Sequence, residues 1–242
     1  GIEPQTAKEW AEEAVRDGVT DTPENEIAVY PSMAGVDHPL VQITDWHDIA
    51  IGASFMNLLQ NLDHPYMKYL FEKNSVGLAK SPQAVEGSSC PATTPINSVY
   101  VGMRNGVAPG EGQAAANNPY AGYSMLNKTY LAQAMPPLYF MKCSEVFFLM
   151  AEGALRGWNM NGTPQQFYEQ GIRYAALEAR TTMNNEYNQL VDEYLNVEAP
   201  KGIAYVDPQG LTPDMPSVTK IGVKWNEGDS PEVKLEKIIT QK

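Results

Sequence analysis

Cysteine is scarce in this sequence, which limits the kinds of protein that the chain can be. Two cysteines among 242 residues cannot form the disulfide framework of a small secreted domain. Cys143 lies in a strongly apolar stretch, and we expect it to be a buried, small hydrophobic residue. Cys90 lies in a segment expected to be a loop, and the sequence leaves open whether the two cysteines pair.

Basic residues are also few. The 17 Lys and Arg residues stand against 29 Asp and Glu residues, which gives a formal net charge of −12, and the basic residues form no cluster. Binding to nucleic acid depends on neutralising phosphates, and binding to an anionic membrane surface depends on a basic patch. The composition therefore argues against both, and we predict that nucleic acid is not a partner.

Long apolar runs are missing as well. The uncharged run at 146–151 is far shorter than the roughly 20 apolar residues of a membrane-spanning helix. These residues contain neither a signal peptide nor a lipid-attachment cysteine. The chain begins with a predicted helix almost at once and stops inside another, so we expect it to be a segment of a longer protein, incomplete at both ends.

The motifs of common catalytic sites are absent too. The sequence contains no Gly-x-Ser-x-Gly motif, no Walker loop, no dinucleotide fingerprint and no His-Glu-x-x-His motif. We therefore predict that the protein is not an enzyme and that it holds no cofactor and no metal.

One cluster could contradict that prediction. Asp45, His47 and Asp48 are spaced like metal ligands and leave a metal-dependent hydrolase as an alternative, but only His38 and His64 remain to complete such a site. We favour the simpler interpretation, in which Asp48 is the N-cap of the following helix.

A pair of glutamates suggests a glycosidase at first sight. Glu145 and Glu152 share a predicted helix face, but seven residues correspond to about 10 Å of helical rise. That distance is near or beyond the upper end of the range for glycosidase carboxylates. Glu152 also precedes Arg156 by four residues, the favourable order for a structural ion pair, so we assign both glutamates to the scaffold.

The clearest positive pattern is a helical hairpin at residues 136–180. Its first helix carries apolar residues at helical spacing and ends before Gly157, which suits a left-handed C-terminal position. Its second helix begins with a Thr163-x-x-Gln166 capping box and Pro164 at the first helical position. Small residues in both helices predict a close antiparallel pair.

Weaker patterns predict the helices and strands outside the hairpin. Trp10 lies on the apolar stripe of the first predicted helix and is expected in the core, and Ser230 precedes the last predicted helix. We predict a mainly α fold with long irregular loops and a few short strands, forming a single domain over residues 1–242. The predicted helices are 6–17, 49–62, 184–195 and 232–242, and the predicted strands are 98–103 and 221–225.

Residues 72–139 form a long irregular insertion, and such segments are usually functional or disordered. This insertion carries tyrosines beside amide and cationic groups, a mixture that suits the apolar faces and hydroxyl edges of sugars. A loop tyrosine more often packs its loop onto the scaffold, and this alternative stays open. The candidate ligand-binding residues are Trp46, which precedes the insertion, and Tyr100, Arg104, Asn105, Tyr120 and Tyr123.

Several stretches together resemble one family. MKCSEVFFLMAEGALRGW and FYEQGIRYAALEA, in the hairpin, are similar to a helix pair of the SusD/RagB family of nutrient-binding outer-membrane lipoproteins. ASFMNLLQNLDHPYMKYLF, YVGMRNG and VKWNEGDSPEVKLEKIITQK resemble the same family in the expected order, and TAKEWAEEAVRDGV resembles its preceding helix. The resemblance covers nearly the whole chain, but only the central to C-terminal portion of a family member.

This resemblance implies a fold, a function and a location. The fold would be a superhelix of tetratricopeptide-like hairpins, with a lipid anchor on a portion outside this sequence. The function would be non-catalytic binding of a glycan, at the cell surface of the outer membrane, for a TonB-dependent (SusC-like) transporter barrel. An alternative is a helical protein-interaction scaffold that contacts the transporter without binding sugar.

Overall fold

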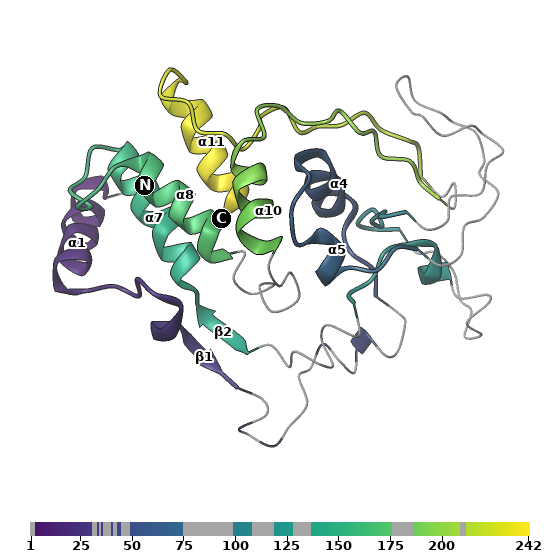
Figure 1. The fold of residues 1–242 in the computed structure, drawn as a ribbon, viewed down its shortest axis with the longest axis horizontal. Coiled ribbons are helices and arrows are strands. Elements are labelled where there is room, and N and C mark those ends of the chain that lie inside the picture. The colour runs from purple at the N-terminus through teal and green to yellow at the C-terminus, as the bar shows by residue number, and fades with distance from the viewer. Residues whose placement is uncertain are drawn as a thin grey trace. The chain divides into compact units, whose positions relative to one another are not determined.

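The chain folds into two compact units in a computed structural model (Figure 1). The structure describes residues 3–30, 33, 35, 40, 43–44, 49–74, 99–107, 119–127, 137–175, 186–208 and 212–242. Unit 1 comprises Gly1–Tyr30, Pro137–Glu198 and Ile221–Lys242, and unit 2 comprises Pro31–Pro136 and Ala199–Lys220. The described residues are mostly helical, as the sequence predicts. Among them, no helix combines the length and hydropathy that crossing a membrane requires.

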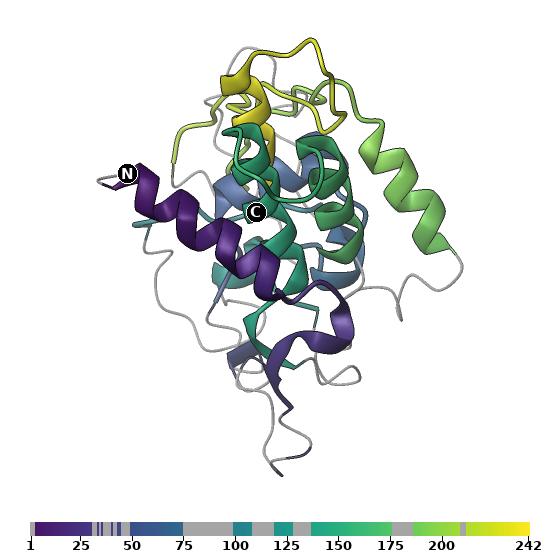
Figure 2. The same cartoon turned by 90° about the vertical axis from the view of Figure 1, so that its left-hand side faces the viewer.

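Unit 1 is built on a helical hairpin. Helices α7 and α8 run side by side in both views (Figures 1 and 2), and α11 packs on α7 while α10 packs on α8. The elements of unit 1 are α1 (Pro4–Asp17), η1 (Pro23–Asn25), β1 (Ile27–Val29), β2 (Leu138–Met141), α7 (Cys143–Leu155), α8 (Pro164–Ala175), α10 (Tyr187–Leu195) and α11 (Pro231–Gln241).

Glycines bring the helices of the hairpin close together, which confirms the predicted small-residue seam. A Cβ atom on Gly171 of α8 would lie 2.7 Å from the Phe148 ring of α7, and one on Gly153 would lie 2.8 Å from the Met160 sulfur. At both positions, any residue larger than glycine would have to displace the neighbouring side chain. The seam fixes how α7 and α8 pack.

The turn between the two helices also follows its sequence signals. Gly157 has φ of +77°, in the left-handed region that favours glycine. The Thr163 N–H donates to Gln166 Oε1 at 3.0 Å, and the Gln166 N–H donates to Thr163 Oγ1 at 3.2 Å. These reciprocal bonds confirm the capping box that starts α8.

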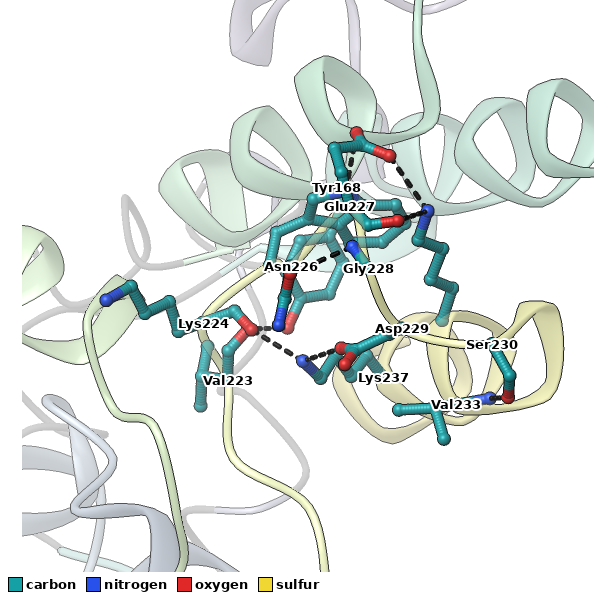
Figure 3. Close-up of polar contacts among 12 residues, drawn as sticks. Tyr168, Val223, Lys224, Asn226, Glu227, Gly228, Asp229, Ser230, Val233 and Lys237 are labelled. Carbon is teal, nitrogen blue, oxygen red and sulfur yellow. Dashed lines mark hydrogen bonds and ion pairs between the residues drawn. The ribbon is translucent and has the colours of Figure 1, made fainter.

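The last helix is tied to the hairpin by a polar network (Figure 3). The Tyr168 hydroxyl of α8 donates to the Val223 carbonyl at 2.7 Å. The buried Lys237 ammonium of α11 donates to the Lys224 carbonyl and to Asp229, both at 2.6 Å. Ser230 caps α11 by accepting from the Val233 N–H, as the sequence predicts.

Three predictions for unit 1 are wrong. Trp10 is 70% exposed, and no residue of α1 is buried; periodicity shows that a helix face is apolar but not that another element covers it. Residues 27–29, expected in a loop, form β1 and pair antiparallel with β2. Residues 221–225 form no strand, because the Val223 and Lys224 N–H groups both donate to the Val197 carbonyl in place of a ladder.

Unit 2 is organised around one helix. Its elements are α4 (Ala53–Leu62), α5 (Met67–Leu70) and η2 (Pro119–Gly122). Met56 and Leu59, both on α4, form a buried cluster with Phe71. The predicted helix 49–62 begins late, at Ala53 with Gly52 as its N-cap, so Asp48 is not the cap of α4. Ile51 instead lies in extended backbone that hydrogen-bonds to Met103 and Ser124.

Candidate functional site

One wall of the candidate site is an extended segment held against the start of α4. The Met103 N–H donates to the Ile51 carbonyl and the Ala53 N–H donates to the Met103 carbonyl, both at 2.8 Å. The pair Gly52 and Met103 forms an isolated parallel bridge, so the predicted strand 98–103 reduces to extended backbone with this single bridge. This pairing places the next two residues, Arg104 and Asn105, at the N-terminal end of α4.

Gly102 makes that pairing possible. A Cβ atom there would lie 2.5 Å from the Gly52 carbonyl oxygen and 2.6 Å from the Ala53 Cα. Both contacts are with backbone, which cannot rotate away as a side chain can. Glycine at position 102 is thus required for the close approach that positions Arg104.

The opposite wall comes from residues 199–208 and 212–218, and two buried asparagines of α4 hold the first of these stretches in place. Asn57 and Asn61 both donate to the Ile203 carbonyl at 3.0 Å, and the Ile203 N–H donates back to Asn61 Oδ1 at 2.8 Å. The Lys201 N–H donates to the Asn61 carbonyl at 2.9 Å. Because a buried amide that is fully bonded fixes its partners, these bonds set where the segment passes over α4.

Beyond Ile203 the chain makes a narrow hairpin-like loop. Tyr205 and Met215 exchange two backbone hydrogen bonds, at 2.8 and 3.0 Å. Inside the loop, the fully buried Asp207 carboxylate accepts from the Tyr123 hydroxyl at 3.0 Å and from the N–H and Oγ1 of Thr212 at 2.7 and 2.9 Å. These donors compensate the cost of burying the carboxylate and tie Asp207 to Thr212 and to Tyr123.

Between the two walls lies a half-open cavity of about 300 Å³, at the lower end of the range of roughly 300–1,000 Å³ for small-molecule sites. A volume of this size suits one unit or one end of a glycan. The polar residues that line the cavity are Ser54, Asn57, Arg104 and Asn105, and the others are Ala53, Tyr205, Met215, Pro216 and Val218.

The polar lining residues divide into bonded and available groups. Asn57 is committed to Ile203 and to Asn61. Within the described residues, by contrast, the side chains of Ser54, Arg104 and Asn105 form no hydrogen bond and no ion pair. Available donors and acceptors beside an apolar wall are what a polar ligand needs for orientation.

Tyr205 is the one aromatic residue among the described residues that line the cavity, and its largely buried ring packs with Ala53 and Val101. Burial, reinforced by the Asp207 carboxylate, raises the pKa of the Tyr205 hydroxyl well above its ordinary value, whereas the Arg104 guanidinium acts in the opposite direction. The hydroxyl therefore stays protonated at neutral pH and can donate as well as accept.

Five of the six predicted ligand-binding residues are described, and of these five the structure brings Arg104 and Asn105 together at the cavity. Tyr100 is half-buried and packs on the Met56 cluster, and Tyr120 is half-buried in η2. Tyr123 is 2% exposed and bonded to Asp207. The alternative in which loop tyrosines pack the loop onto its scaffold thus describes Tyr100 and Tyr123. Trp46 lies outside the described residues.

Other sequence candidates can be placed in the same way. Asp45, His47, Asp48 and Cys90 lie outside the described residues, and among those that the structure describes no group of three or more His, Cys, Asp or Glu residues could hold a metal. Glu152 pairs with Arg156 at 2.7 Å, the structural role expected for it. Cys143 is a buried free thiol, and burial together with Glu26 raises its pKa to about 12.

Sequence patterns missed Ser54, Asn57 and Tyr205. Ser54 and Asn57 are three residues apart on one helix face, but this spacing does not show that residues 199–208 cross that face. Tyr205 lies in a stretch rich in Pro and Gly that carries no periodic pattern. The long-range bonds from α4 to Ile203 and the packing of Tyr205 on Ala53 bring these residues together.

Comparisons with known proteins agree on one family. Residues 1–242 match the family described as "SusD-like: Susd and RagB outer membrane lipoprotein". Similar solved structures include a SusD-like protein from Bacteroides thetaiotaomicron (26% identity, TM-score 0.72), a chitin-binding SusD homolog from Flavobacterium johnsoniae (27%, 0.72) and a SusD homolog from Bacteroides ovatus (30%, 0.68). A comparison with curated proteins gives no significant match.

These matches cover nearly all of this chain but less than half of each related structure. The three structures cover 100%, 99% and 100% of this chain, whereas the chain covers 44%, 43% and 44% of theirs. The chain therefore spans less than half the length of each of these relatives. Because the family match extends from the first residue to the last, this chain belongs to the SusD-like family.

Proposed function

We propose that the whole protein is a non-catalytic glycan-binding protein at the cell surface of the outer membrane, where it delivers a nutrient to a TonB-dependent, SusC-like transporter. Two comparisons support this proposal. The family is described as one of outer-membrane lipoproteins, and one structural relative is a chitin-binding protein. The lipid anchor would be carried by a portion outside this sequence.

The observation that carries the proposal is the cavity at the start of α4. It combines an aromatic ring, Tyr205, with the side chains of Ser54, Arg104 and Asn105, which have no bonding partner among the described residues. Sugars are bound through apolar contacts with their C–H faces and hydrogen bonds to their hydroxyl groups. Trp46, which is not among the described residues, and Tyr120 remain proposed contributors.

The direct test is calorimetry or a glycan array with the full-length protein. We expect Asn105→Ala to weaken binding of the selected glycan about 10-fold, since one lost hydrogen bond is worth roughly 1–2 kcal/mol. Arg16→Ala on α1 is the control, because Arg16 lies in unit 1 and pairs there with Glu13 and Asp17. If no glycan binds, the proposal fails.

One observation favours a second function, a scaffold that contacts a protein partner without binding sugar. Phe140 of β2 and Ile27 of β1 are 74% and 57% exposed, and Trp10 of α1 is also exposed. Exposed apolar side chains often mark protein contacts. Co-purification with a membrane barrel, lost in Phe140→Ser, together with no response to any glycan, would favour this function. The hydrolase alternative depends on Asp45, His47 and Asp48, for which metal-dependent turnover would be the sign.

A further inference from the structure

We infer that the cavity of unit 2 takes an anionic sugar, whose carboxylate is bound by the guanidinium of Arg104. This inference rests on the proposed glycan-binding function and names the chemical class of the ligand. A guanidinium matches a carboxylate with two parallel N–H···O bonds, which gives both strength and orientation.

The first argument is the lack of a counter-ion. The protein has 29 acidic and 17 basic residues, so acidic partners are plentiful. Elsewhere in the described chain, cations such as Lys201, Arg173 and Lys237 pair with carboxylates at 2.6–2.8 Å. Arg104 is half-buried in the cavity wall, yet in that same part of the chain its guanidinium has neither an ion pair nor a hydrogen bond. A ligand carboxylate would supply the missing partner.

The second argument is the position of the nearest acidic groups. Asp207 influences Tyr205, as does Arg104, so Asp207 is the obvious candidate counter-ion. Its two carboxylate oxygens are instead bonded to Tyr123 and Thr212 inside the loop. Asp214 accepts from the Asp207 N–H at 3.0 Å. Both carboxylates thus stabilise the loop, and neither forms an ion pair with Arg104 in the described structure.

The third argument is what surrounds Arg104. Among the described residues that line the cavity it is the single charged one, so no carboxylate of the lining repels an anion. Asn105 and Ser54 offer neutral hydrogen-bonding groups beside it, and Met215, Pro216 and Val218 offer an apolar wall for the sugar ring. The net charge of −12 acts weakly here, because salt at physiological strength screens charges more than about 8 Å apart.

The test uses the full-length protein and three matched ligands: oligomers of a hexuronate, the same oligomers with every carboxyl group methyl-esterified, and the corresponding neutral hexose oligomers. We expect the hexuronate to bind at least about 10-fold more tightly than its methyl ester, as a bidentate charged pair predicts. Arg104→Gln should abolish this preference, and Arg104→Lys should retain part of it. Asn105→Ala should weaken all three ligands alike.

The outcomes separate this inference from the function on which it rests. Binding of neutral and esterified oligomers as tight as that of the hexuronate would overturn the inference and leave glycan binding intact. A preference for the hexuronate that survives in a folded Arg104→Gln protein would also overturn it. Binding of sulfated but not of carboxylated oligomers would overturn the assignment to a carboxylate. No binding to any glycan would overturn both.

Discussion

The hydroxyl of Tyr123 donates to the buried carboxylate of Asp207 at 3.0 Å, linking the insertion to a loop more than eighty residues later. The sequence places Tyr123 among candidate sugar contacts, but this bond gives it a structural role. Burial, together with the nearby Asp207 charge, raises the pKa of the Tyr123 hydroxyl far above its ordinary value. The hydroxyl therefore stays protonated and remains a donor at neutral pH.

Removing that hydroxyl should destabilise unit 2. In Tyr123→Phe the ring keeps its place, but Asp207 loses the hydrogen bond from the hydroxyl, and a hydrogen bond to a charged group is worth about 1–3 kcal/mol. Urea denaturation would measure the loss, and hydrogen exchange should quicken in 205–208 and 212–215. Tyr30→Phe, at an exposed tyrosine of unit 1, is the matched control. Equal stability of Tyr123→Phe and the parent protein would contradict the assigned role.

Adding a methyl group at Gly102 should damage both the fold and the cavity. The new Cβ would meet backbone at 2.5 Å, so the segment 101–103 must move away from α4, at a cost of about 1–3 kcal/mol. Arg104 and Asn105 would move with it, and ligand affinity should fall.

Gly52→Ala provides the comparison for Gly102→Ala. Its Cβ would have an ordinary contact of 3.8 Å with Asn105 Oδ1, so the free energy of unfolding should change little. Calorimetric melting and ligand titration of the two variants would check both expectations. A Gly102→Ala protein as stable as Gly52→Ala would show that the close approach does not constrain the fold.

The capping box of α8 should contribute about 1 kcal/mol to the free energy of unfolding. Thr163→Ala removes the acceptor of the Gln166 N–H and is expected to lower the free energy of unfolding by that amount. Thr163→Ser keeps the oxygen and should retain most of the stability. Chemical denaturation of both variants tests this, and equal losses in the two would mean that the hydroxyl bond contributes nothing.

Burial lowers the pKa of His64 to about 3. The folded protein therefore keeps this ring neutral, whereas the unfolded chain takes up a proton below about pH 6.5. The associated stability is complete above pH 6.5 and is lost progressively as the pH falls toward 3. We expect a loss on the order of 1–2 kcal/mol between pH 7 and pH 5 from this group. Denaturation of His64→Gln at the same pH values should show a shallower decline; an identical decline would refute the assignment.

Local signals in the sequence predicted the hairpin well. Gly157, the Thr163 and Gln166 box and the Glu152–Arg156 pair all form as expected, because each depends only on residues within four positions. Predictions that depend on distant partners were less successful. Trp10 lies on an apolar stripe that is exposed, and β1 is a strand because β2, more than a hundred residues later, pairs with it.

The candidate site shows the same division between local and distant information. Composition drew attention to Arg104 and Asn105, since a cation and an amide beside tyrosines are typical of sugar sites. It could not separate Tyr123 from them, because only the bond to Asp207 shows that this ring belongs to the core. Tyr205 was missed because its position follows from the bonds of Asn57 and Asn61 to Ile203.

The division between bonded and available polar groups has a consequence for how this protein can evolve. Asn57, Asn61 and Asp207 hold backbone in place, so most substitutions there would be removed by selection for folding. The side chains of Ser54, Arg104 and Asn105 form no hydrogen bond and no ion pair among the described residues. Substitutions at such positions usually change the free energy of unfolding by no more than about 0.5 kcal/mol. Under the proposed function, a descendant could therefore exchange one ligand for another by point substitution at these three positions while inheriting the scaffold unchanged.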